Sequence, residues 1–165
     1  MATILFYTFG LVALVAGVST ILQRNPVASA ISLVVTLACL AGLFTLLEAH
    51  FAATMQILVY TGAIMVLFVF VIMLLNLQDH ELGTAHYTPW KFVGGGLAAL
   101  TAVLIVATVW GISGTAKATP VSADYGTIEA VGSALFSTWL FPFEVISLVL
   151  TAAIAGAVII GKKEL

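Results

Sequence analysis

The stretch FAATMQILVYTGAIMVLFVFVIMLLNL, from Phe51 to Leu77, decides the fold. It carries no charged side chain and exceeds the roughly 20 apolar residues that a helix needs to cross a hydrocarbon core about 30 Å thick. Its middle, however, is polar. At about 100° per residue, Gln56 and Tyr60 fall on one face of a helix, and Thr61 and Met65 fall on roughly the opposite face. Lipid cannot satisfy polar groups, so we expect this helix inside a bundle, contacted on more than one side.

The whole chain has the composition of an integral membrane protein. Of its 165 residues, 62% are hydrophobic and 7% are charged, whereas about a quarter of the residues of a soluble domain are charged. The net charge of −2 does not indicate nucleic-acid binding. The single cysteine, Cys39, excludes an intramolecular disulfide and an iron–sulfur cluster held by this chain alone. The three histidines lack the spacing of metal ligands, so we expect no metal or cofactor bound by this chain.

Four further apolar stretches predict an all-α integral membrane protein that forms a single membrane domain over residues 1–165. Pro26 suits the first turn of the second span. The longest connection, 113–139, has apolar residues at helical spacing, which predicts a short amphipathic helix at the membrane surface. The five predicted spans cover residues 2–22, 27–47, 52–77, 90–112 and 140–161.

The basic residues are distributed unequally between the two sides of such a five-span protein. Lys117 lies alone on one side, and the other side has Arg24, Lys91, Lys162 and Lys163. Cytoplasmic loops carry an excess of lysine and arginine. This pattern predicts a multi-pass protein of the cell membrane with its N-terminus outside and its C-terminus in the cytoplasm.

Ionisable residues within membrane spans are costly and are therefore candidates for function. Glu48 ends the second span, where an interfacial carboxylate in water and a functional group are both open interpretations. Glu144 is expected in the first turn of the fifth span, where a helix N-terminus favours negative charge. By composition alone, Tyr60 is a bundle tyrosine with a satisfied hydroxyl.

Three segments resemble one family of membrane proteins in the expected order along the chain. They are RNPVASAISL at 24–33, LVYTGAIMVLFVFVIMLLNL at 58–77 and FPFEVISLVLTAAIAG at 141–156. The central segment is the longest and the most specific. These segments are similar to the subunit J family of bacterial NADH-quinone oxidoreductases, the respiratory complex I, whose mitochondrial counterpart is subunit 6.

The resemblance implies a π-bulge near Tyr60 and Gly62 that relaxes to a regular α-helix and gates a water path from the quinone site. One extra residue in a turn rotates everything beyond it, so two registers of one helix can act as a switch. The family often has a glutamate at the position of Glu144. Other members place an acidic residue near the start of this span, where this chain has Gln56. The candidate residues for the coupling path are therefore Gln56, Tyr60, Thr61, Gly62, Glu144 and Glu48.

The resemblance also implies a role and a set of partners. The chain would be a non-catalytic subunit of a proton-translocating NADH-quinone oxidoreductase, without a complete active site. It would form a hetero-oligomer with other membrane-arm subunits in the bacterial inner membrane, while NADH, FMN, iron–sulfur clusters and quinone bind elsewhere. Two alternatives stay open: a small multi-span transporter, for which a repeated half is not visible, and a structural or assembly membrane protein.

Overall fold

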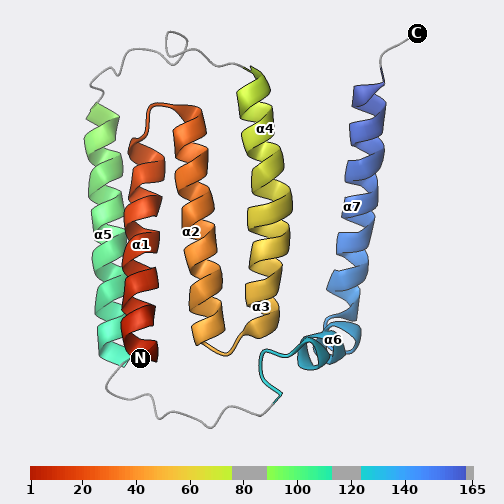
Figure 1. Ribbon diagram of the computed structural model, residues 1–165, viewed down its shortest axis with the longest axis horizontal. Helices are drawn as coiled ribbons and strands as arrows, with labels where there is room; N and C mark the ends of the chain where they lie inside the picture. The colour runs from red at the N-terminus through yellow and green to blue at the C-terminus, as the bar shows by residue number, and fades with distance from the viewer. Residues whose placement is uncertain (76–88, 113–123, 163–165) are drawn as a thin grey trace. The chain divides into compact units, whose positions relative to one another are not determined.

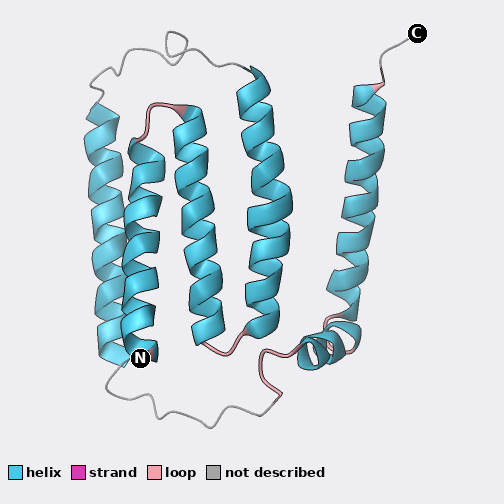
Figure 2. Cartoon of the chain, in the orientation of Figure 1, coloured by secondary structure: helices cyan, strands magenta, loops and turns pink. Residues whose placement is uncertain are grey.

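A computed structural model of the chain describes residues 1–75, 89–112 and 124–162 (Figure 1). These described residues form helices and no strand (Figure 2). Five helices among them are long and apolar enough to cross a membrane, which confirms the all-α fold and the five predicted spans. Residues 76–77, at the end of the predicted third span, lie outside the described residues. The five helices are Ala2–Leu22, Pro26–Leu46, His50–Leu75, Val93–Gly111 and Leu140–Gly161.

The chain divides into two structural units. The first comprises residues 1–74 and 123–165, and the second comprises residues 75–122. The described part of the second unit is one helix, α5 (Pro89–Ile112). The helices of the first unit are α1 (Ala2–Leu22), α2 (Pro26–Leu46), α3 (His50–Met55), the π-helix η1 (Gln56–Ile64), α4 (Met65–Leu75), α6 (Ile128–Phe136) and α7 (Leu140–Gly161).

Helices α1 and α2 form an antiparallel hairpin (Figure 1). Pro26 opens α2 as predicted, and the side chain of Asn25 caps the helix by accepting hydrogen bonds from two backbone N–H groups, of Val27 and Ala28, at 2.9 and 3.2 Å. Further along, a Cβ at Gly42 would lie 3.1 Å from the ring of Phe9. The absence of a side chain at Gly42 therefore lets the two helices pack closely.

The third span is one continuous helical rod made of α3, η1 and α4 (Figure 1). Within the described residues, both α3 and η1 pack against α2. Helix α3 also contacts α6, which in turn contacts α7 through an edge-to-face pair of Phe136 and Phe143 with ring centroids 5.2 Å apart. A short helix thus lies in the connection where one was predicted. Its amphipathic character and its place at a membrane surface stay predictions.

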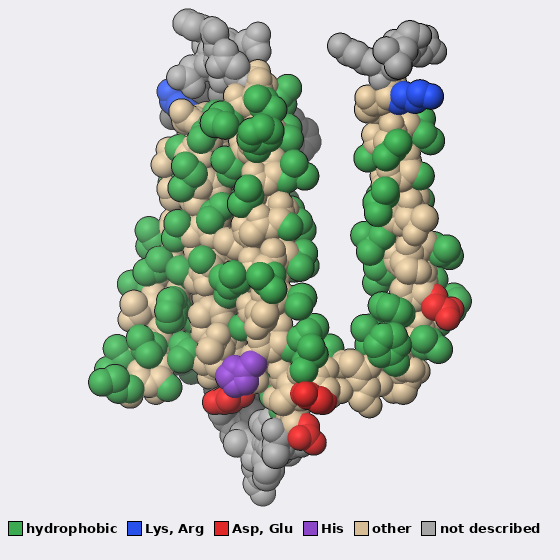
Figure 3. Space-filling model, turned by 45° about the vertical axis from the view of Figure 1, so that its right-hand side comes forward, with side chains coloured by type: hydrophobic (Ala, Val, Ile, Leu, Met, Phe, Trp, Pro, Cys, Tyr) green, Lys and Arg blue, Asp and Glu red, His purple; other side chains and the backbone are tan. Residues whose placement is uncertain are grey.

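The side chains are sorted as expected for a protein surrounded by lipid and partner helices. Among the described residues the buried positions hold mostly small side chains, and none of the large side chains is fully buried. Large apolar side chains instead cover the outside of the helices (Figure 3). A soluble protein would expose far less apolar surface in one piece. The buried residues are Ala16, Ala30, Cys39, Ala41, Ala53, Gln56 and Met65.

Candidate functional site: the π-helical centre of the third span

The middle of the third span leaves the regular α-helical pattern from Gln56 to Ile64. At its end the backbone N–H of Met65 donates to the carbonyl of Tyr60, five residues back. A side chain follows the same register: the Thr61 hydroxyl donates to the carbonyl of Gln56 at 3.1 Å, also five residues back. In the neighbouring α-helical turn, the Thr54 hydroxyl reaches the carbonyl only four residues back. The segment therefore lies where the resemblance implies a π-bulge, and it is wound one residue wider than an α-helix.

Gly62 lies in this segment at a point where the backbone comes close to itself. A Cβ at this position would lie 3.1 Å from the carbonyl oxygen of Ile57, five residues back. That distance is shorter than an ordinary van der Waals contact, and the atom it meets belongs to the helix backbone, which cannot turn aside as a side chain can. A glycine therefore suits the π register at this position.

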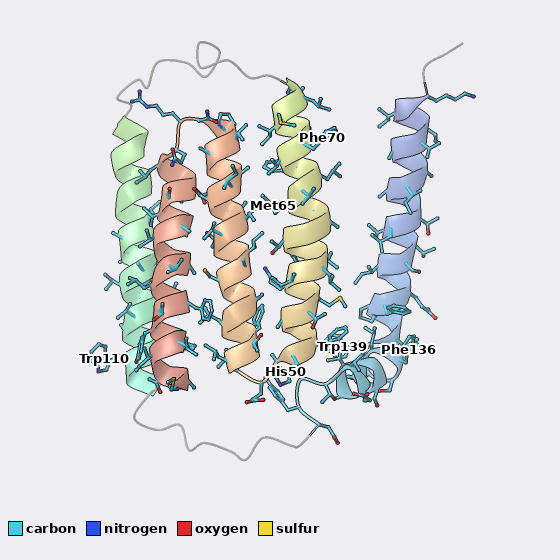
Figure 4. The ribbon with its side chains drawn as sticks, in the orientation of Figure 1. His50, Met65, Phe70, Trp110, Phe136 and Trp139 are labelled. Carbon is cyan, nitrogen blue, oxygen red and sulfur yellow. The ribbon has the colours of Figure 1, made fainter. Side chains whose placement is uncertain are left out.

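The wider winding changes which residues share a face. In a regular α-helix the step of nine positions from Gln56 to Met65 makes two and a half turns, which led us to place the two side chains on opposite faces. That prediction is wrong: both are buried, Gln56 at 8% and Met65 at 5% exposure. In the π-helix the same nine positions make about two turns. In this register both side chains lie on one side of the third span, and Figure 4 shows Met65 on the side that faces α2.

Tyr60 is less buried than Gln56 and Met65. Its side chain is half exposed in the chain, at 51%, while Thr61 and Gly62 are intermediate. A phenol hydroxyl at the centre of a membrane needs a hydrogen-bonding partner. The exposed position of Tyr60 leaves that hydroxyl free to meet another subunit or a water molecule. The structure thus gathers four of the six candidates, Gln56, Tyr60, Thr61 and Gly62, in one segment.

Glu48 lies at the end of α2, apart from that segment, and its backbone is strained. Its φ of 61° makes it the only residue other than glycine with a positive φ in the described part of the chain. Its N–H donates to the carbonyl of Thr45 at 3.2 Å, and the N–H of Ala49 donates to the carbonyl of Phe44 at 2.9 Å. These two bonds make a Schellman motif, in which glycine usually occupies the position that Glu48 holds.

The Glu48 carboxylate pairs with a histidine rather than with a group inside the membrane. The Nε2 atom of His50 lies 3.1 Å from Oε2 of Glu48, with side-chain exposures of 59% for His50 and 78% for Glu48. Such an exposed pair contributes little to stability. Figure 4 shows His50 at the N-terminal end of α3. The observed contacts favour the interfacial interpretation of Glu48.

We expected Glu144 in the first helical turn of α7, but it lies beyond that turn. The helix begins at Leu140, so Glu144 is its fifth residue, and the first turn contains no acidic side chain. The favourable effect of a helix N-terminus on a negative charge fades within the first turn. The helix dipole therefore does not explain a carboxylate at this position. Glu144 is exposed in this chain.

No group of three or more potential metal ligands occurs within the described ranges. The segment can change its helical register between π and α, and it carries several polar groups.

Comparison with known proteins identifies the family of this chain. Residues 16–160 match the family model described as NADH-ubiquinone/plastoquinone oxidoreductase chain 6. The chain belongs to that family. It is 37% identical to NADH-quinone oxidoreductase subunit J of Escherichia coli (strain K12), over 96% of this chain and 86% of that protein. It is 37% identical to subunit J of Rhodobacter capsulatus, over 96% and 81% of the two chains. It is also 38% identical to the chloroplastic NAD(P)H-quinone oxidoreductase subunit 6 of Chlorokybus atmophyticus, over 97% and 82%.

The membership in the chain 6 family confirms the resemblance drawn from three segments of sequence. The match covers the second, third and fourth spans in full and parts of the first and the fifth, and η1 lies inside it. The position of one residue was predicted incorrectly from the sequence. Met65 was assigned to the wrong face because a period of 3.6 residues was assumed through the π segment.

Proposed function

We propose that this chain is a non-catalytic membrane-arm subunit of a proton-translocating NADH-quinone oxidoreductase, and that its third span couples quinone reduction to proton translocation. Family membership supports a membrane subunit of such a complex. The π register of η1 is the observation that carries the coupling role. NADH, FMN, iron–sulfur clusters and quinone would bind to other subunits.

The coupling step would be a change of register in η1. Conversion to an α-helix turns Met65 and everything beyond it by up to about half a turn relative to Gln56. Gln56 and Met65, which are both buried in this chain, could then no longer share one face of the helix. Side chains would be exchanged between the α2 side and the opposite side, and this exchange would open or close a water path beside the helix.

Gln56 and Thr61 would provide neutral hydrogen-bonding groups along that path, and Tyr60 a hydroxyl on its outer side. Gln56 is an amide and cannot itself gain or lose a proton at physiological pH. In this proposal it orders water but carries no charge. Glu144 and Glu48 are secondary candidates, because both are exposed in this chain and lie outside η1.

The proposal includes the location and orientation of the chain. The protein would lie in the bacterial inner membrane with its N-terminus outside and its C-terminus in the cytoplasm. Arg24 and Lys162 are the described basic residues of the cytoplasmic side, while Lys91 has no described side chain and Lys117 and Lys163 lie outside the described residues. A reporter fused after Leu165 should be active in the cytoplasm, and a cytoplasmic signal from a reporter in 113–126 would contradict this orientation.

The Gly62→Val variant tests the coupling role in the intact complex. A β-branched side chain at this position crowds the carbonyl of Ile57. Quinone-linked turnover and proton pumping should fall, while electron transfer from NADH to an artificial acceptor stays normal. Gly10→Val is the matched control, because a Cβ at Gly10 meets nothing within 4 Å. Tyr60→Phe should act more mildly, since only a hydroxyl is lost. Normal pumping in an assembled Gly62→Val complex would refute the proposal.

Purification in mild detergent followed by mass spectrometry separates this function from the alternatives. Co-purification with NADH-oxidising subunits supports a place in the complex. A small homo-oligomer that contains only this chain would instead indicate a self-contained transporter. Co-purification combined with normal pumping in the Gly62→Val variant would indicate a purely structural or assembly role.

A further inference from the structure

The turn that precedes α6 docks onto the turn that joins α2 to α3. The carbonyl oxygen of Gly126 accepts a hydrogen bond of 2.9 Å from the backbone N–H of Phe51. Gly126 has a φ of 72°, in the left-handed region. Just after it, Thr127 caps α6 by accepting from the N–H of Ala130 at 3.2 Å. Phe51 and Gly126, 75 positions apart in the sequence, are thus joined through their backbones. We call this link the turn clamp.

Only glycine fits at this point of the turn clamp. A Cβ at Gly126 would overlap the carbonyl oxygen of Glu48 and would lie 2.8 Å from the Cα of Ala49. Both atoms belong to the backbone of the Schellman turn that contains Glu48. A backbone turn fixed by two hydrogen bonds cannot move aside as the end of a flexible side chain can. Any side chain at position 126 must therefore push the two turns apart.

The bond within the turn clamp uses a group that the helix leaves without a partner. Phe51 is the second residue of α3, and the first four N–H groups of an α-helix have no acceptor inside that helix. The Gly126 carbonyl supplies the acceptor. The clamp lies five residues before Gln56, the first residue of η1. It therefore holds the end of the third span that lies directly before the π segment.

We propose that Gly126 is a positioning residue for the third span. It holds the start of α3 in place, so that a change of register in η1 rotates α4 and does not rotate α3. This inference rests on the proposed coupling function. A helix free at both ends could change register by turning either half. With the start of α3 held by a backbone bond and by the short turn from α2, Gln56 keeps its face toward α2, and Met65 is the residue that moves.

Two matched pairs of variants test the turn clamp in the assembled complex. Gly126→Ala adds a methyl group that overlaps the Glu48 carbonyl, and Gly132→Ala adds the same group in α6 where a Cβ meets nothing within 4 Å. Phe51→Pro removes the donor N–H at a position of the first helical turn that tolerates proline. Phe51→Ala removes the same ring but keeps the N–H. The two readouts are hydrogen exchange in residues 48–56 and the number of protons pumped per quinone reduced.

Gly126→Ala and Phe51→Pro should raise exchange in residues 48–56 by about tenfold or more, because the amide of Phe51 loses its acceptor or is removed and the end of the helix loosens. Both should lower the proton-to-quinone ratio, with NADH oxidation by an artificial acceptor unchanged. Gly132→Ala and Phe51→Ala should match the wild type in exchange and in ratio. Together these results would support the proposal.

Unchanged exchange in Gly126→Ala and Phe51→Pro would overturn the turn clamp. Raised exchange with a wild-type proton-to-quinone ratio would overturn the positioning role. Failure of both variants to assemble would also count against it, since it would make Gly126 a folding residue. If the proposed function itself is wrong, Gly62→Val will pump normally, and the exchange result for Gly126→Ala will still report on the clamp separately.

Discussion

Replacing Gly62 with alanine should shift the third span toward the α-helical register by a predictable amount. Alanine stabilises an α-helix by about 0.8–1 kcal/mol relative to glycine. In the π register the added methyl group instead lies 3.1 Å from the Ile57 carbonyl and is crowded. Both effects favour the α register, so the two together should be at least about 1 kcal/mol. This corresponds to a change of about fivefold in the ratio of the two registers.

The assay is quinone-linked turnover and proton pumping in membranes that contain equal amounts of assembled complex. If each cycle passes through the π register of η1, turnover should fall by about fivefold in Gly62→Ala and further in Gly62→Val. The rate with an artificial electron acceptor should not change, because in the proposed function that reaction takes place in other subunits. Gly10→Ala adds the same methyl group in α1 without a contact within 4 Å and should behave as the wild type. Wild-type turnover in a fully assembled Gly62→Ala complex would refute this reasoning.

Three further predictions concern other parts of the chain. Glu48→Gly should relieve the left-handed strain and stabilise the folded complex by about 1 kcal/mol. Glu48→Gln keeps the strain and should give no gain. Equal midpoints of thermal unfolding for the two variants would contradict this prediction. Asn25→Ala removes the cap of α2 and should cost about 1 kcal/mol, seen as faster hydrogen exchange in residues 25–29; Asn25→Asp keeps an acceptor and should stay protected. Expression of the chain without the other subunits should give degradation or aggregation, because its large apolar side chains are exposed; a stable, monodisperse monomer would argue against partner helices.

The sequence predicted the five spans closely because length and apolarity largely determine a transmembrane helix. Most ends of the predicted ranges lie within two residues of the observed helix ends. The start of α2 was also predictable, because Pro26 fits the first helical turn for reasons that involve only its own backbone. Local chemistry and the thickness of a membrane were sufficient for these features.

The face assignments of the third span could not be predicted in the same way. A period of 3.6 residues fails inside η1, so Met65 was placed opposite Gln56 although both are buried. Gly126 was missed for a different reason. Its role depends on a backbone 75 positions earlier in the chain, with which it shares a hydrogen bond to Phe51. No local pattern of residues around a glycine reveals a contact of that kind.

The surroundings of the two candidate carboxylates, Glu48 and Glu144, could not be predicted from the sequence either. Glu48 was identified as a residue of interest, but the sequence does not show that it occupies the glycine position of a Schellman motif. A strained residue of this kind motivates a question about its side chain, and its observed partner is His50. Glu144 was placed one helical turn too early relative to the start of α7, which led to an argument from the helix dipole that its position does not support.

The most direct test of the account is to determine the register of the third span in the intact complex, at rest and during turnover with NADH and quinone, by electron cryo-microscopy. If the third span switches register, it should be a π-helix over Gln56–Ile64 in one state, with Gln56 and Met65 on the same face. In the other state it should be a regular α-helix, with Met65 turned away from α2 and Gln56 still facing it. The same π register in both states would contradict the claim that this helix couples quinone reduction to proton translocation.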